Sequence, residues 1–426
     1  MIKSVTGGIV DYFQHLRMIS KNAWMFLAGS FFINLLFAIN FLIFNLYLRE
    51  LGFSESVIGR TLSAGAIGSL VAAIPCALII ARYPIKRMLI ATTMILAVCF
   101  FMMVTVREPL LIMFFSFLVG ANVSFSRVAS APIIMRNSTP EERTYVFSLS
   151  FANWMLPGMI GSVLGGYAQE WYAATFSPGA DSYRFVLLAG IVLGICAIGP
   201  FALIKAKPPS SDERKLVLNK ALLKDQGRIL SKLALPFFFV GMGAGLIIPF
   251  LNLYFRDEFS MSTDEIGIYY SLVQATMIIG TMAGPVLAKK IGMVRTIVWT
   301  ELASIPFMLL MAFSGYEWIV VASFLCRGAL MNMGQPIGTN FAMEMVRKEV
   351  HGLTNSVMMI AWTSSWAVST QIGGWVIEHH GYIPSFLITV GLYTLSAFLY
   401  FTFFSRSEKK ENGVYHIQMG SKRDFS

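Results

Sequence analysis

Three charged side chains lie inside otherwise apolar runs, and these residues are the most suited to chemistry: Arg127, Glu301 and Arg327. A charge at the centre of a bilayer costs at least about 2.5–3.5 kcal/mol, so each needs a partner, water or a function. A guanidinium is a forked donor suited to anionic groups. A buried carboxyl group is suited to carrying a proton, which predicts a coupling role for Glu301. The structural alternatives are bonds from the arginines to backbone carbonyls and a contact from Glu301 to a neighbouring helix.

Other polar and aromatic residues are scattered through the apolar runs. We predict that six of them contact a bound solute together with the two arginines: Asn40, Asn153, Trp154, Gln274, Gln335 and Trp362. Each could equally be a contact between helices, where such hydrogen bonds are worth about 0.6 kcal/mol on average. The sequence leaves both interpretations open.

Two basic turns interrupt the apolar runs, and they are copies of one another. In ALIIARYPIKRML (77–89) and PVLAKKIGMVRTI (285–297), Arg82 aligns with Lys290 and Arg87 with Arg295. NLYLRE (45–50) and NLYFRD (252–257) repeat in the same way. A long internal repeat in a membrane chain is typical of transporters whose halves move about a central site.

We predict that the basic side chains of the two turns form a gate: Arg82, Lys86, Arg87, Lys289, Lys290 and Arg295. Setting the topology of the chain would explain these cations about as well.

The elements that must position these residues are membrane-spanning helices. Hydrophobic residues make up 56% of the 426 residues, charged residues only 13%, and the mean hydropathy is +0.66. Each crossing needs about 20 largely apolar residues, and only helices can cross singly with their backbone satisfied. The fold class is therefore all-α, a polytopic protein with twelve spans in two pseudo-symmetric six-helix bundles. The spans are predicted near 22–48, 57–81, 88–106, 109–135, 144–170, 185–205, 233–255, 264–288, 296–315, 318–343, 352–378 and 382–404.

The net charge of +10 reflects the placement of basic residues on one side of the membrane, and it does not indicate binding of nucleic acid. Most of the Lys and Arg residues fall on one side of the predicted spans, which places both termini in the cytoplasm. We predict a cytoplasmic N-terminal segment (1–21), an N-terminal bundle (22–205), a central cytoplasmic loop (206–231), a C-terminal bundle (232–404) and a cytoplasmic tail (405–426). The chain is expected in the cytoplasmic membrane, as a monomer in contact with lipid.

The six-plus-six repeat, the long central loop and the two basic turns resemble the major facilitator superfamily. The family's turn reads Gly-x-x-x-Asp-Arg-x-Gly-Arg-Lys. This sequence keeps Arg82, Lys86 and Arg87, and it replaces the aspartate by Ala81 and, in the second copy, by Lys289. Gly161, Gly165 and Gly166 partly match a pattern of family exporters, although close helix packing explains these small residues better.

The resemblance implies a secondary transporter that works by alternating access. In this superfamily spans one, four, seven and ten line the central cavity, which would place Arg127 and Arg327 on the substrate route. The cargo would be a small organic solute, and protons the energy source.

Within that class, efflux of amphipathic or drug-like compounds leads, because the chain holds 25 Met and 35 Phe. Uptake or exchange of an anionic nutrient is the alternative, favoured by the two arginines. A receptor or lipid-handling protein on the same scaffold is an alternative of another class. The sequence carries no P-loop and no catalytic motif, so we expect no enzyme activity, no cofactor and no metal.

Overall fold

The computed structural model describes residues 19–80, 83–137, 140–205, 220–411 and 414–417. Most of the predicted N-terminal segment, the first half of the predicted central loop and the end of the tail lie outside these ranges. The chain divides into two compact units. The first comprises Met1–Tyr47 and Gly68–Leu216, and the second comprises Leu48–Ile67 and Val217–Ser426. The short segment 48–67 therefore belongs to the second unit although its sequence lies in the first half.

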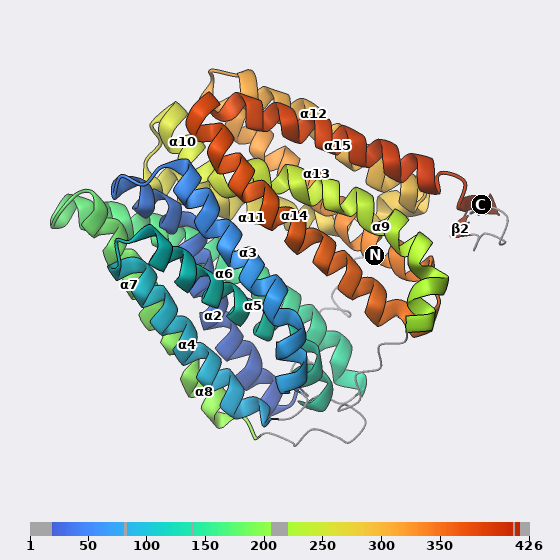
Figure 1. Cartoon of the computed structure of the whole chain (residues 1–426), viewed down its shortest axis with the longest axis horizontal. Coiled ribbons are helices and arrows are strands. Elements are labelled where there is room, and N and C mark those ends of the chain that lie inside the picture. Colours follow the sequence, from blue (N-terminus) through green and yellow to red (C-terminus); the bar gives the residue numbers. More distant parts are fainter. Residues whose placement is uncertain (1–18, 81–82, 138–139, 206–219, 412–413, 418–426) are drawn as a thin grey trace, which may run out of the picture. The chain divides into compact units, whose positions relative to one another are not determined.

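The first half of the chain is a series of apolar helices joined by short turns (Figure 1). A cluster of buried side chains that includes Phe26, Leu89, Ile133, Val146 and Phe201 forms a core of the first unit. Gly179 lies at the start of α7, and its φ angle is 82°. Glycine adopts this backbone conformation without strain. The helices are α2 (Lys21–Glu50), α3 (Glu55–Ile80), α4 (Ile85–Thr105), α5 (Pro109–Asn137), α6 (Pro140–Thr175), α7 (Ala180–Ile195) and α8 (Ile198–Leu203).

The second half repeats this series and ends in a short hairpin. A core of the second unit contains Leu233, Val294, Phe341, Tyr400 and Phe404. Its elements are α9 (Lys220–Ile247), η2 (Ile248–Phe250), α10 (Leu251–Phe259), α11 (Thr263–Ile291), α12 (Met293–Phe313), α13 (Glu317–Glu344), η3 (Lys348–Val350), α14 (His351–His380), α15 (Tyr382–Phe404), β1 (Glu408–Glu411) and β2 (Val414–Ile417).

The predicted all-α membrane architecture is confirmed. Every predicted span falls on a described helix, with α7 and α8 sharing one span and α9, η2 and α10 sharing another. Among the described residues, nine spans meet a strict criterion of length and apolarity. Helices α6, α13 and α14 are not among them, because small and polar residues interrupt their apolar runs.

The internal repeat extends to individual hydrogen bonds. The hydroxyl of Tyr47 donates to the carbonyl oxygen of Val104 at 2.6 Å, between α2 and α4. In the second half the hydroxyl of Tyr254 donates to the carbonyl oxygen of Met311, the equivalent pair of the NLY repeat. Because each bond lies within one unit, the two halves share their internal packing as well as their sequence pattern.

Gly161 in the first half and Gly373 in the second half lie at close helix contacts. A Cβ on Gly161 in α6 would lie 2.8 Å from Cβ of Ala38 in α2. A Cβ on Gly373 in α14 would lie 2.4 Å from the carbonyl oxygen of Leu246 in α9. Small residues allow helices to approach closely in lipid, so the packing interpretation of these glycines is supported.

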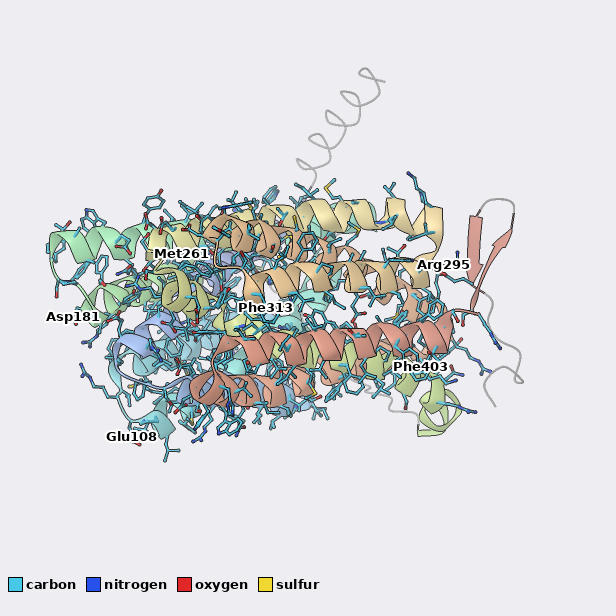
Figure 2. The ribbon with its side chains drawn as sticks, turned by 90° about the horizontal axis from the view of Figure 1, so that it is seen from above. Glu108, Asp181, Met261, Arg295, Phe313 and Phe403 are labelled. Carbon is cyan, nitrogen blue, oxygen red and sulfur yellow. The ribbon has the colours of Figure 1, made fainter. Side chains whose placement is uncertain are left out.

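The tail contains a hairpin that the sequence reasoning did not foresee. Strands β1 and β2 pair antiparallel, and Figure 2 shows the hairpin beside the end of the second unit that carries Arg295. The two carboxylate oxygens of Glu408 accept hydrogen bonds from the backbone N–H groups of Met293 and Val294, at 2.6 and 3.2 Å. The carboxylate thus satisfies two of the unpaired donors at the start of α12. Burial raises the pKa of Glu408, and the two N–H groups and Arg295 oppose that shift.

Candidate functional site

Arg127 lies in α5, within the apolar stretch Pro109–Ala129, and its side chain is accessible to solvent although protein surrounds most of the guanidinium. An arginine side chain that faces hydrocarbon is costly. The side chain of Arg127 is therefore expected to meet a protein group, water or a polar ligand. Ser124 lies one turn before Arg127 and is fully buried, and Ser126, the residue directly before Arg127, is exposed.

Arg327 has the opposite environment. It lies in α13, is only 4% exposed, and donates from Nη2 to the hydroxyl of Tyr393 in α15 at 2.8 Å. Its guanidinium carbon also lies 5.7 Å from the centre of the Tyr393 ring. The Nε atom is buried and has no hydrogen-bond partner among the described residues. The guanidinium therefore lies among α13 and α15 of the second unit.

Glu301 lies in α12 and is also 4% exposed. Its carboxyl group lies near the side chains of Ser396, Tyr393 and Tyr400 in α15. Its Oε1 atom, like the hydroxyl of Tyr400, has no partner among the described residues. Glu301, Arg327, Tyr393, Ser396 and Tyr400 thus form a polar cluster inside the second unit, which we call the Glu301 cluster.

Some of the predicted solute-binding residues of the first half form hydrogen bonds between helices, and others are exposed or partly buried. The side-chain amide of Asn153 donates to the carbonyl oxygen of Leu27 at 3.0 Å, and that of Asn34 donates to the carbonyl oxygen of Asn153 at 2.8 Å. These bonds join α2 to α6. Trp154 is 57% exposed, and Asn40 is partly buried in α2. The described contacts of Asn153 are those of a helix-to-helix bond, and its role as a solute ligand stays a prediction.

In the second half an aromatic group surrounds one predicted residue. The ring of Trp362 lies 5.9 Å from that of Trp366 in α14 and 5.2 Å from that of Phe237 in α9. Gln274, in α11, is partly buried, and its Oε1 atom has no partner among the described residues. Gln335, in α13, is exposed. No described contact joins these residues to one another, so their common role in binding also stays a prediction.

Two contacts of these residues escaped the sequence reasoning. Tyr393 and Phe237, the first of three consecutive phenylalanines, lie in apolar runs. Nothing in these runs marks them as partners of Arg327 and Trp362. Trp362 and Trp366 are four residues apart, and this spacing does place them on one helix face.

The basic turns lie at helix ends. Four of the six basic side chains are exposed: Arg87, Lys289, Lys290 and Arg295. Lys86 is partly buried, and Arg82 lies outside the described residues. Figure 2 shows Arg295 and Phe403 towards one end of the second unit and Met261 and Phe313 towards the other. The turn 289–295 and the tail hairpin therefore share one end of this unit, and the gating role of the turns stays a prediction.

A polar network binds segment 48–67 to the rest of the second unit. Arg49 pairs with Glu55 and lies 3.7 Å from Asp257, and the hydroxyl of Tyr382 donates to Asp257 at 2.7 Å. Arg49 belongs to NLYLRE and Asp257 to NLYFRD, so the two copies of one repeat meet in this pair.

Contacts to α14 extend the attachment of segment 48–67. The backbone N–H of Ser56 donates to Glu378 at 3.0 Å, and the hydroxyl of Ser63 donates to the carbonyl oxygen of Ala367 at 2.6 Å. Between these bonds the backbones meet at glycines. A Cβ on Gly374 would lie 2.2 Å from the carbonyl oxygen of Glu55 and 3.1 Å from Cα of Gly59.

Two related sets of membrane-spanning helices, with ionisable residues inside the spans, define a polytopic membrane protein of the transporter class. The sequence profile of the Major Facilitator Superfamily matches residues 25–370 and 233–419. The chain belongs to this superfamily. It is therefore an integral, multi-pass membrane transporter, and its family is one of transporters rather than of enzymes.

Solved structures with the same fold include three transporters. A bacterial homolog of the human lysosomal transporter Spinster, inward-facing and unoccupied, has a TM-score of 0.73 and 14% identity, over 90% of this chain and 96% of that one. The nucleoside transporter NupG has a TM-score of 0.71 and 14% identity, over 90% of this chain and 98% of that one. A bacterial homologue of the iron transporter ferroportin, in an inward-facing state, has a TM-score of 0.71 and 13% identity, over 89% of this chain and 98% of that one. No curated protein sequence matches the chain. At these identities the likeness establishes the fold alone.

Proposed function

We propose that this protein is a proton-coupled secondary transporter that exports amphipathic organic solutes by alternating access. The observation that carries the proposal is the attachment of segment 48–67, which comes from the first half, to α14 and Asp257 of the second half. Its described contacts include hydrogen bonds, one ion pair and a close approach of backbones at glycines. Such an attachment can separate and re-form as a unit, as alternating access requires.

The nature of the solute follows from the exposed groups in the spans. The exposed Arg127 favours a carboxylate or another electron-rich group on the cargo. Within the second unit, the aromatic group of Phe237, Trp362 and Trp366 would suit an apolar group of a solute. We propose an amphipathic organic anion as the class of solute.

The orientation follows from charge. The basic side chains of the turns, including the exposed Lys289, Lys290 and Arg295, are proposed to face the cytoplasm of the cell membrane. Segment 48–67 would then face the outside. Uptake of an anionic solute is the second candidate, favoured by Arg127, and the likeness to transporters of nucleosides and of iron supports neither direction.

The test is flux in proteoliposomes under a pH gradient of either sign, with carboxyfluorescein as an amphipathic anion and rhodamine 6G as an amphipathic cation. We expect carboxyfluorescein to move against the direction of proton flow, and rhodamine 6G to move little. Movement in the same direction as the protons would replace export by uptake. Absence of flux for both dyes, with retained carboxyfluorescein binding, would favour a receptor.

The close approach at the glycines gives a sharper prediction. In Gly374→Ala the added methyl group must displace the backbone at Glu55, and overpacking of this kind costs about 1–3 kcal/mol. Segment 48–67 should then detach more often from α14. A reporter Ser63→Cys, in a background without the native cysteines, should react roughly tenfold faster with an impermeant maleimide.

The matched control is Gly391→Ala in α15, where an added Cβ meets nothing within 4 Å. It should leave the reaction rate of the cysteine at position 63 unchanged. Equal rates in the two alanine variants would mean that the attachment of segment 48–67 does not depend on the glycine contact.

A further inference from the structure

The two basic turns differ at the residue that directly precedes the next helix. The alignment of the repeat places Pro84 before α4 and Gly292 before α12. Pro84 has a φ of −64°, and its ring locks this angle. Gly292 is the single residue between α11 and α12 and has a φ of 93°, and glycine has the widest choice of backbone angles. The sequence therefore makes the second junction a hinge, whose angle must be held by other contacts.

A carboxylate from the tail makes contacts of this kind. Glu408, at the start of β1, accepts hydrogen bonds from the backbone N–H groups of Met293 and Val294, one on each oxygen, at 2.6 and 3.2 Å. These two residues directly follow the hinge, and the N–H groups of a first helical turn have no partner within the helix. Bonds to a charged acceptor are among the stronger hydrogen bonds. The paired bonds fix the direction in which α12 leaves Gly292.

The chain on both sides of Glu408 holds this carboxylate in place. Phe404, the last residue of α15, is fully buried, and its ring lies 5.1 Å from that of Phe341 in α13. A short turn follows, in which the N–H of Ser407 donates to the carbonyl oxygen of Phe404 at 3.0 Å. After Glu408, strand β1 pairs with β2 beside the end of the unit that carries Arg295 (Figure 2). A short tether keeps the effective concentration of the carboxylate at the hinge high.

The charges at this end of the unit favour the contact and also allow it to open. Segment 285–297 contains three basic residues and no acidic one, and the start of a helix favours a negative charge. Burial raises the pKa of Glu408 and Glu344 of α13 adds to this shift, whereas the two N–H groups and Arg295 oppose it. The contacts thus only partly replace the water that the carboxylate loses when it docks, which suits a restraint that can be released.

We propose that the C-terminal tail is a releasable strap, fastened by Glu408, that holds the hinge at Gly292 and thereby slows solute exchange. With the strap docked, α11 and α12 keep their present angle. With the strap released, the hinge turns and the basic turn 289–295 changes its position. The strap itself needs neither cargo nor a gradient, and only its effect on the rate of solute exchange rests on the proposed function.

Hydrogen exchange of the full-length purified protein, followed by mass spectrometry, tests the strap without cargo. In Glu408→Ala the amides of Met293 and Val294 lose the carboxylate that accepts from them. A peptide that covers 291–297 should therefore exchange roughly tenfold to a hundredfold faster at these two positions. Peptides from the middle of α14, which the strap does not hold, should exchange as in the parent.

The matched control is Glu344→Gln. It removes an exposed acid near Glu408 whose described hydrogen bond is with Asn340, so segment 291–297 should keep the exchange rate of the parent. Equal exchange of this segment in the parent and in Glu408→Ala would show that the tail does not hold the hinge. Faster exchange throughout the second unit would show that Glu408 stabilises the whole unit, which would overturn the strap as well.

A second measurement tests the effect on transport, as the uptake of radiolabelled fluorescein into proteoliposomes that are preloaded with the unlabelled compound. The initial rate should rise by up to roughly tenfold in Glu408→Ala, because the two bonds no longer have to break before the hinge turns. It should stay unchanged in Glu344→Gln. A parental rate in Glu408→Ala, with the two amides exchanging faster, would refute the restraint on transport. A parent protein without any uptake would instead refute the proposed function, and the hydrogen exchange would still decide the strap.

Discussion

Replacing Arg127 by glutamine is expected to weaken the binding of carboxyfluorescein by roughly thirtyfold or more. Loss of one partner of a charged, largely desolvated hydrogen bond typically costs about 2–5 kcal/mol. Arg127→Lys keeps the charge and loses the forked geometry, so its affinity should fall between those of the parent and of the glutamine variant. The measurement is fluorescence polarisation of the dye on purified protein.

The control for this series is Arg406→Gln, an exposed arginine beyond the end of α15. It removes the same charge outside the spans and should leave the affinity unchanged. If Arg127→Gln binds the dye as the parent does, or if Arg406→Gln weakens binding as much, then Arg127 does not contact the cargo.

Arg327→Gln is expected to act on stability. Its bond to Tyr393 is buried on both sides, and a hydrogen bond to a charged group contributes about 1.5–3 kcal/mol. The free energy of unfolding should therefore fall by about that amount. Tyr393→Phe should cost a similar amount, and the double variant less than the sum of the two, because both remove one interaction.

Thermal and denaturant unfolding in detergent, together with dye affinity on the same samples, decides the role of Arg327. A glutamine variant that keeps the melting temperature of the parent but loses affinity would show that Arg327 is a substrate ligand, as the sequence alone predicts.

The two arginines show what a sequence can and cannot provide. Both lie in apolar runs of similar length, so the sequence identifies each as a costly charge that needs an explanation. Which way a side chain points depends on the packing of α5 and α13, and that is fixed by neighbours far apart in the chain. Tyr393 is 66 residues from Arg327, and nothing in the local sequence announces their contact.

The spans and the repeat were predictable because they depend on local physics. A bilayer crossing requires a long apolar helix, and a duplicated half leaves paired motifs such as NLYLRE and NLYFRD. The tail was less predictable, because a polar segment such as that around Glu408 gains its order from a partner, here the start of α12. The pairing of Arg49 with Asp257 likewise needed the three-dimensional structure.

Counterflow tests most directly the claim that this chain carries a solute across the membrane by alternating access. Proteoliposomes are loaded with unlabelled fluorescein and diluted into a trace of radiolabelled fluorescein, with no pH gradient. We expect a transient accumulation of label above its equilibrium level, since a carrier exchanges solute between the two sides whatever its energy source. Binding of fluorescein to the purified protein without any such accumulation would contradict it.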